Sequence, residues 1–309
     1  MTMYTIASGA THGLRYVEET TPGTTPASPR IVELNHNSCS LTLSRDTFTA
    51  NALRADRQIP FHRTGVDKVS GDVAFDLVSG EYDPFLQAAL AGNWTSDVLD
   101  AGTAVHAFTL ERAFKNIGQY ATYVGCFVNQ FTLSIKPNEM ISGTFSFVGL
   151  SGEKGETPLS SSPTPAPEGD PFDSFRGSLK IDDSVIAIIT GIDLTLANGI
   201  EPQYGLFGRS AQAVSWGRST LSGTLSAFYT DGNLPDMFIN DARVKLEFTL
   251  TRGDYGYTFL IPNITLTGAE DSAQSEGPIT LSVPWSAALD ATLGTNFRIT
   301  RTVPEVVEP

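Results

Sequence analysis

Lysine, cysteine and long hydrophobic runs are all scarce in this sequence of 309 residues. It has six lysines and two cysteines, and its 34 Asp and Glu outnumber its 20 Lys and Arg, which gives a net charge of −14 at pH 7. Non-specific nucleic-acid binders need an excess of cations to neutralise phosphates, so this charge balance argues against that class. Two cysteines cannot build a disulfide framework for a chain of this size. The longest apolar stretch, Val185 to Ile189, is far short of the roughly 20 residues that span a membrane, so we expect no membrane partner.

Recognisable motifs for catalysis, cofactors and metals are also missing. The sequence has no nucleophile elbow, phosphate-binding loop or dinucleotide fingerprint. The four histidines lie far apart, without the spacing of metal ligands: His12, His36, His62 and His106. We expect them to be exposed, and we expect the acidic pairs Glu18-Glu19, Asp182-Asp183 and Glu270-Asp271 to lie in solvated turns. The sequence therefore predicts no enzyme, no cofactor and no metal ion.

Residues typical of strands and turns are abundant instead. Thirty-four threonines, 28 glycines and 18 prolines favour a mainly β protein. Apolar and polar residues alternate over 72–77 and 244–250, which is the pattern of strands with one buried and one wet face. Residues 85–90 predict two helical turns, with Asp83 as N-cap and Pro84 as first helical residue. A second short helix is expected at 234–239.

Two polar segments divide the chain. Residues 1–30 are predicted to be an N-terminal arm that ends in a Thr/Pro cluster, and residues 151–171 contain five prolines among several serines. Such a segment has too few apolar residues to offset its ordering entropy, and proline favours extended chain, so 151–171 is predicted to be a semi-rigid linker. The remaining parts are a first domain at 31–150, a second domain at 172–300 and a C-terminal tail at 301–309.

The two halves match one another in several places, in the same order. The matched pairs are 40–44 with 193–197, 69–73 with 221–225, 108–112 with 248–252, 131–133 with 264–266, and 143–147 with 277–281. The offset between them changes mainly between strands, where loops tolerate insertions. The ordered set predicts a duplicated domain in which strands flank one short helix. The alternative is that two sets of strands converged on similar sequences.

Arginine is concentrated between the first two matched segments. This cluster contains Arg45, Asp46, Arg54, Asp56, Arg57 and Arg63, and the corresponding stretch of the second half carries Arg209 and Arg218. One interpretation is a solvated hairpin whose exposed ion pairs add little stability. The other is an intersubunit contact, in which arginine pairs bidentately with carboxylates on an acidic partner surface.

Four short strings occur in order along the first half: Tyr16–Pro26, Ala55–Gln58, Val69–Asp72 and Glu81–Leu86. In sequence and spacing they resemble the tail tube proteins (major tail proteins) of long-tailed, siphovirus-type bacteriophages. The resemblance is clearest over residues 15–150, and the second half agrees mainly through the internal repeat. None of these strings is a catalytic signature.

The resemblance implies a structural virion protein whose rings stack into a hollow tube that guides genomic DNA from the capsid to the host. It implies two tandem β-sandwich or barrel domains, each with a short flanking α-helix, and sheets that join between neighbours around the lumen. The implied partners are other copies of the chain, the tape measure, tail terminator and distal tail proteins, and double-stranded DNA that passes without sticking. The implied location is the virion tail, assembled in the cytoplasm of the host bacterium.

Most family members carry one tube domain and form hexameric rings, so two domains in one chain imply trimeric rings with pseudo-sixfold symmetry. If the second domain instead decorated the outside of the tube, six chains per ring would be expected. In the family, a long loop between early strands and a terminal arm contact the next ring. By position, this favours an inter-ring or intersubunit contact for the arginine cluster, namely Arg45, Arg54, Asp56, Arg57 and Arg63, with Arg209 in the corresponding stretch.

In such a tube, the negative net charge of the chain would have a function. Carboxylates that line a lumen repel phosphates, so DNA can slide without sticking. Asp72 and Asp76, on the polar side of a predicted strand, are candidates for this lining. The simpler alternative is that the net charge only keeps the unassembled subunit soluble.

Two other classes of function remain open. A receptor- or carbohydrate-binding β module of a virion or cell surface would use exposed aromatic rings such as Trp94, Trp216 or Trp285. A hydrolase on a β scaffold would show a buried carboxylate pair with perturbed protonation.

Overall fold

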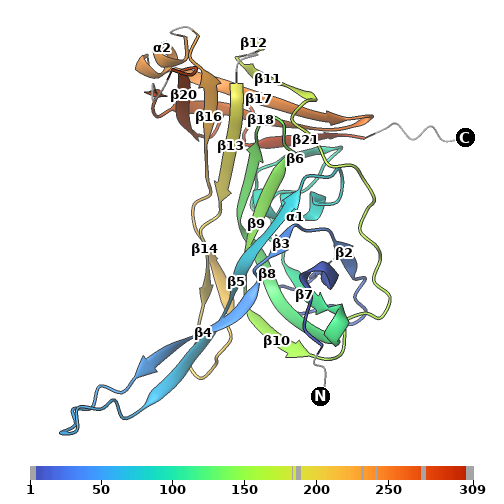
Figure 1. The fold of residues 1–309 in the computed structure, drawn as a ribbon, viewed down its shortest axis with the longest axis vertical. Helices are drawn as coiled ribbons and strands as arrows, with labels where there is room; N and C mark the ends of the chain where they lie inside the picture. The colour runs from blue at the N-terminus through green and yellow to red at the C-terminus, as the bar shows by residue number, and fades with distance from the viewer. Residues whose placement is uncertain are drawn as a thin grey trace, which may run out of the picture.

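Antiparallel strands dominate the molecule, as a computed structural model shows (Figure 1). The structure describes residues 5–303 except 183, 186–188, 231–232, 241 and 273–275. Within these residues, nineteen strands are connected by hydrogen bonds into one sheet, and β14 and β15 form a separate ribbon. The prediction of a mainly β fold is confirmed.

The first half contains β1 to β10 and α1. The bounds are β1 (His12–Glu18), β2 (Val32–Leu34), β3 (Ser38–Cys39), β4 (Thr42–Thr49), β5 (His62–Asp76), α1 (Asp83–Leu90), β6 (Val98–Asp100), β7 (Phe108–Phe114), β8 (Gln119–Ile135), β9 (Ser142–Gly149) and β10 (Ser151–Gly155). The main strands lie side by side in the order β1-β7-β8-β9-β5-β4, and β10 pairs with the first part of β8.

The second half contains β11 to β21 and α2. The bounds are β11 (Gly177–Ile181), β12 (Ser184–Val185), β13 (Ile189–Ala197), β14 (Ile200–Gln203), β15 (Ala213–Trp216), β16 (Thr220–Phe228), α2 (Asn233–Ile239), β17 (Arg243–Arg252), β18 (Tyr255–Leu266), β19 (Glu270–Ser272), β20 (Thr280–Ala287) and β21 (Arg298–Thr302). The main strands lie in the order β11-β17-β18-β20-β16-β13, and β21 pairs with the first part of β18. The strand order of the first half therefore recurs.

The halves join edge to edge. β13 pairs with the end of β8, from Ile192 opposite Ile135 to Ala197 opposite Gln130, and β21 pairs with β6. Figure 1 shows β13 alongside the long strands of the first half, of which β8 is its neighbour. Buried residues of both halves also belong to one hydrophobic cluster. The division into two domains therefore stays a prediction, because sheet and core continue across the predicted boundary.

Helix α1 closes the core of the first half. The Phe85 ring lies 4.7 Å from that of Phe108 and 5.6 Å from that of Phe145, between ring centroids. The predicted helix is present, but its N-cap is Tyr82 and not Asp83. Asp83 is instead the first helical residue, and its carboxylate bonds to groups of the second half.

Parts of the predicted arm and linker are built into the sheet. β1 lies within 1–30 and pairs along its whole length with β7, and β10 opens the segment 151–171 and pairs with β8. Farther along, Leu159 N donates to Glu111 at 2.6 Å and Thr164 N donates to the Ile31 carbonyl at 2.8 Å. The prediction of an arm and a linker rested on the average composition of each segment, which does not show the few residues that bind it to the sheet. Of the predicted tail 301–309, residues 304–309 lie outside the described part.

The last part of the repeat has a different register from the predicted one. Phe145 lies opposite Val73 as Val283 lies opposite Leu225, so 143–147 corresponds to 281–285 and not to 277–281. Thr132 lies opposite Thr144 of β9, and Glu270 lies opposite Ser282 of β20, which is the equivalent of Thr144 in this register. Residues 131–133 therefore correspond to 269–271, and the predicted match with 264–266 is wrong by five residues. Alternating Leu and Thr look alike after such slips, so strand sequences alone misalign easily.

Candidate functional site

Six adjacent strands from both halves share one polar face. β5, β9 and β8 of the first half continue through β13, β16 and β20 of the second. One row of directly paired residues crosses all six: Asp76, Ser142, Ser134, Asp193, Thr224 and Pro284. The adjacent row is Ala74, Thr144, Thr132, Thr195, Ser222 and Ser286. The residues between these positions are buried, except the partly exposed Gly223, because successive side chains of a strand point to opposite faces.

Hydroxyls and carboxylates make up most of this face. Neither row contains Lys or Arg, and Ser134 Oγ donates to Asp193 at 2.6 Å. Asp72 and Asp76, singled out from the sequence, both lie on it: Asp72 is exposed, and Asp76 accepts a hydrogen bond from Asn37 Nδ2 at 2.9 Å. The face can exclude anions, and it offers hydroxyls without fixed positive charge.

The β4–β5 hairpin projects from one end of the molecule (Figure 1). β4 has β5 as its only partner strand among the described residues, so its outer edge is open there. The hairpin also carries exposed apolar side chains, because Phe48, Ile59 and Phe61 are 58%, 59% and 65% exposed. An unpaired strand edge that carries exposed apolar side chains is a surface to which another protein chain can bind.

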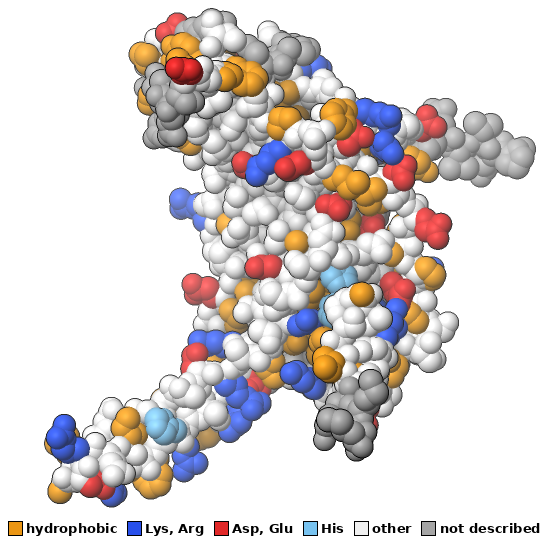
Figure 2. All heavy atoms as spheres, viewed as in Figure 1, with side chains coloured by type: hydrophobic (Ala, Val, Ile, Leu, Met, Phe, Trp, Pro, Cys, Tyr) orange, Lys and Arg blue, Asp and Glu red, His pale blue; other side chains and the backbone are white. Residues whose placement is uncertain are grey.

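The predicted arginine cluster lies on this hairpin, where Figure 2 shows basic side chains gathered over the projecting arm. Arg45 pairs with Asp67 and Arg54 Nη2 pairs with Asp56 at 2.6 Å. The hydrogen bond from Arg54 lowers the pKa of the Asp56 carboxyl. Arg57 and Arg63 are exposed on the same hairpin. The Arg54–Asp56 pair is exposed on both sides and contributes little stability, whereas Asp67 is buried beneath the half-exposed Arg45.

Arg209 lies at the base of the same hairpin. Its carbonyl accepts a hydrogen bond from Asp67 N at 2.8 Å, and the neighbouring Tyr204 hydroxyl donates to the Asp67 carbonyl at 3.0 Å. The structure thus brings the two arginine-bearing stretches of the two halves together. Whether they contact another copy stays a prediction.

A network of charged residues also links the two halves, in addition to the pairing of β8 with β13. Arg301 donates to Asp83 and to Asp97 at 2.6 Å each, and Tyr257 donates to Asp83. Arg298 makes two bonds to Asp100, at 2.7 and 2.8 Å. Burial raises the pKa of Tyr257, and Asp83 raises it further. Sequence patterns did not reveal this network, because its members are about 200 positions apart.

Glu19 is a second residue whose role the sequence did not reveal. It was expected in a solvated turn but is only 6% exposed, which corrects that expectation. Its carboxylate accepts hydrogen bonds from Gly23 N at 2.6 Å, Thr109 Oγ1 at 2.7 Å and Gly125 N at 2.8 Å. The bonds hold the Thr/Pro turn against the sheet, which gives a physical reason for the string Tyr16–Pro26.

The expectation of exposed histidines is wrong for His12 and His36. Both are half-buried, and His12 Nδ1 lies 2.8 Å from His36 Nε2. Burial and the charge of Arg112 lower the pKa of His12 to about 4. His106 is also held, 2.8 Å from Glu18 Oε1, whereas His62 is exposed on the hairpin. The described residues contain no group of three or more side chains placed to hold a metal ion.

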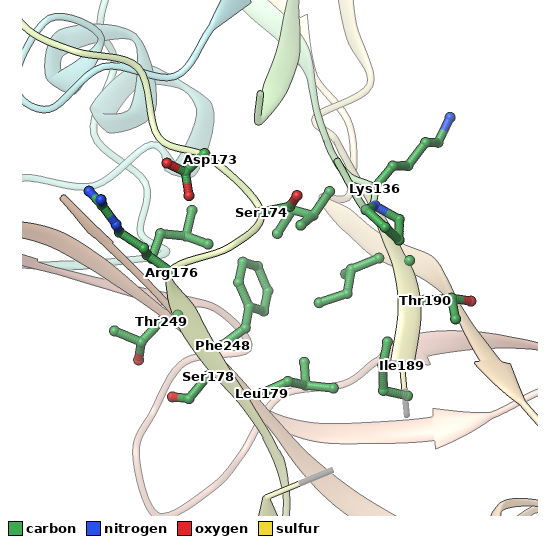
Figure 3. A pocket seen from close by; sticks show the side chains of 16 residues that line it. Lys136, Asp173, Ser174, Arg176, Ser178, Leu179, Ile189, Thr190, Phe248 and Thr249 are labelled. Carbon is green, nitrogen blue, oxygen red and sulfur yellow. The ribbon is translucent and has the colours of Figure 1, made fainter. Parts of the chain in front are cut away.

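The three tryptophans of the receptor- or carbohydrate-binding alternative lie in different surroundings. Trp285 is buried, Trp94 lies under the Arg301 guanidinium at 4.8 Å, and Trp216 is 37% exposed, so the three rings do not form one exposed surface. A pocket of about 320 Å³ opens between β11 and β13, and the Phe248 ring points into it (Figure 3). One of its lining residues, Ile189, directly follows residues 186–188 in the sequence, which lie outside the described part.

Comparison with known protein families decides the identity. A family model described as phage tail tube protein matches residues 9–287. The chain belongs to this family. Tail tube proteins are structural components of the virion tail that assemble with themselves and with other tail proteins, so the predicted class is confirmed. A search of curated proteins found no match. Among the described residues, no helix is long and apolar enough to cross a membrane.

Proposed function

We propose that three copies of the chain close into a ring and that the rings stack into a hollow tube, through which double-stranded genomic DNA passes during infection. The observation that carries the proposal is the continuous polar face, which uses strands of both halves without interruption. A sheet with one polar face and one buried face can line a tube without exposing its core.

The chemistry of the polar face suits a conduit. Its hydroxyls are neutral, Asp72, Asp76 and Asp193 repel phosphates, and neither of the two paired rows carries a cation that would retain DNA. In this proposal the face is the wall of the lumen. A nucleic-acid-binding groove would need the opposite charge.

The trimer follows from the internal repeat. If each half, 31–150 and 172–300, is one tube unit joined through the segment 151–171, three chains supply the six units of a hexameric family ring. The tube would assemble in the cytoplasm of the host bacterium together with the tape measure, tail terminator and distal tail proteins. The arginine cluster of the hairpin, Arg45, Arg54, Asp56, Arg57 and Arg63 with Arg209 at its base, would contact a neighbouring copy.

Electron microscopy of the concentrated protein tests this proposal. Hollow rings with three chains per ring are expected, and a gold label on Asp72→Cys should appear inside the lumen. Six chains per ring would overturn the trimer, and a label on the outer wall would overturn the assignment of the polar face. Closed particles without a lumen would overturn the conduit itself.

A further inference from the structure

We propose that a cavity at the C-terminal end of α1, bordered by Trp216, binds a neutral carbohydrate. Its lining residues lie within 90–105 of the first half and within 198–219 and 289–296 of the second. The cavity has a volume of about 500 Å³, which is within the range of about 300–1,000 Å³ of small-molecule sites. None of the lining residues belongs to the two paired rows of the polar face, so the site is separate from the proposed wall of the lumen.

The absence of charge around this cavity limits what it can hold. None of the described residues that line it is Asp, Glu, Lys, Arg or His, although 17% of the chain is charged. A phosphate, carboxylate or ammonium group would be buried there without a counter-ion, and such burial is costly. This disfavours a nucleic acid, and it disfavours the segment 304–309 of another copy, which contains two glutamates. The cavity therefore suits a neutral ligand.

A buried amide offers an unused acceptor to this ligand. Asn198 lines the cavity and is only 4% exposed. Its Nδ2 donates to the carbonyls of Ala89 at 2.9 Å and Val128 at 3.1 Å, whereas its Oδ1 has no hydrogen-bond partner among the described residues. The side chains of Thr103 and Ser219 add hydroxyls to the lining. Because polar groups removed from water cost free energy unless they are bonded, this lining favours a ligand rich in hydroxyls over a purely apolar one.

Trp216 adds an aromatic surface to the same cavity. Its side chain is 37% exposed, and its ring stands at 85° to the buried Phe127 ring, with 6.1 Å between the centroids. An indole has a large, rigid apolar face, on which the C–H groups of a sugar ring can pack while the sugar hydroxyls bond to amides and hydroxyls nearby. An indole, a free amide oxygen and hydroxyls in an uncharged cavity together select a carbohydrate as the ligand.

Hydrogen bonds join the walls of the cavity in the absence of a ligand. Gly102 N donates to the Leu90 carbonyl at 2.9 Å, which holds the segment after β6 against the end of α1. Ala101 N donates to Thr295 Oγ1 at 3.2 Å, which ties this wall to the second half. Walls that are ordered beforehand lose little conformational entropy on binding, so the site does not depend on a rearrangement of the chain.

A glycan array tests the ligand class. The fluorescently labelled full chain is applied to neutral oligosaccharides of glucose, galactose, mannose and N-acetylglucosamine, next to sialylated and uronic-acid-containing ones. Neutral oligosaccharides should retain the protein, and the acidic ones should not. Retention of no neutral oligosaccharide, or equal retention of acidic ones, would overturn the proposal. Because the array needs no rings, its outcome is independent of the proposed function.

Substitutions test the location of the site, with the best neutral oligosaccharide of the array measured by titration calorimetry. Trp216→Ala should lower the affinity by about tenfold, because it removes the aromatic surface. Phe207→Ala is the matched control, since Phe207 is a fully exposed aromatic residue of the loop between β14 and β15 that does not line the cavity. It should leave the affinity unchanged.

A second variant keeps the test decisive if Trp216→Ala fails to fold. Ser219→Trp adds bulk at an exposed lining position without removing a packed side chain, so it should block the cavity and abolish binding. An unchanged midpoint of thermal unfolding identifies the folded variants. Full affinity in folded Trp216→Ala or Ser219→Trp would overturn the site, and so would an equal loss in Phe207→Ala.

Discussion

Both halves of the molecule have the same strand order, yet only the first encloses its helix. Phe85 and Leu86 of α1 are fully buried, whereas Phe238 and Ile239 of α2 are 36% and 72% exposed. The reason is the length of the segment between each helix and the next long strand. Residues 91–107, including β6, wrap α1 and reach β21, while only residues 240–242 separate α2 from β17. A shared topology therefore does not imply a shared degree of burial.

Residues of the second half also bind helix α1 of the first half. Asn198 Nδ2 donates to the carbonyl of Ala89 in α1 at 2.9 Å, and Arg301 binds Asp83. The pairing of β21 with β6 adds a backbone contact between the halves. The halves are therefore held together by the β8–β13 and β6–β21 pairings and by these two side-chain contacts.

The largest expected effect comes from truncating the two helices in parallel. Phe85→Ala removes a buried ring that touches Phe108, Phe145 and Phe147, and it should lower the free energy of unfolding by about 3–5 kcal/mol. Met237→Ala, at a half-exposed position of α2, should cost no more than about 1 kcal/mol. Urea denaturation measures both. Equal losses would contradict the difference in burial between the halves.

A smaller effect is expected at the junction between the halves. Asp83→Asn keeps the size of the side chain but removes the charge that faces Arg301, and it should cost about 2 kcal/mol. Asp236→Asn, at an exposed position of α2, is the matched control and should change stability by less than about 0.5 kcal/mol. Thermal unfolding of both variants is the measurement. An unchanged midpoint for Asp83→Asn would show that the network does not fasten the halves.

The smallest effect concerns acid sensitivity of the first half, which contains all four histidines. The pKa of His12 is lowered from 6.5 to about 4, so between these values the unfolded chain binds the proton more readily than the folded one. Stability from this group is present above pH 6.5 and is lost as the pH falls toward 4. His12→Gln should therefore flatten the decline in the free energy of unfolding over this window, relative to its own value at about pH 7.5. Parallel curves for the variant and the parent would contradict the assignment.

Several features could be predicted because they depend on local pattern. Alternation placed Val73 and Phe75 in the core and Asp72 on the polar face, and the run after Pro84 specified α1. The polar face itself could not be foreseen as a unit, since it needs β8 and β13 to be adjacent. The same limit explains Glu19, which looks like a turn acid until the fold brings Gly125 N within 2.8 Å.

By itself, the sequence determined the β class, the family and the existence of matched segments in the two halves, because composition, short strings and side-chain alternation are local properties of a chain. Only the tertiary structure decided the register of the last matched strands and the joining of the halves through β8 and β13. These depend on which backbone groups find partners far along the chain, and strands of alternating Leu and Thr satisfy several registers equally well until the rest of the core selects one.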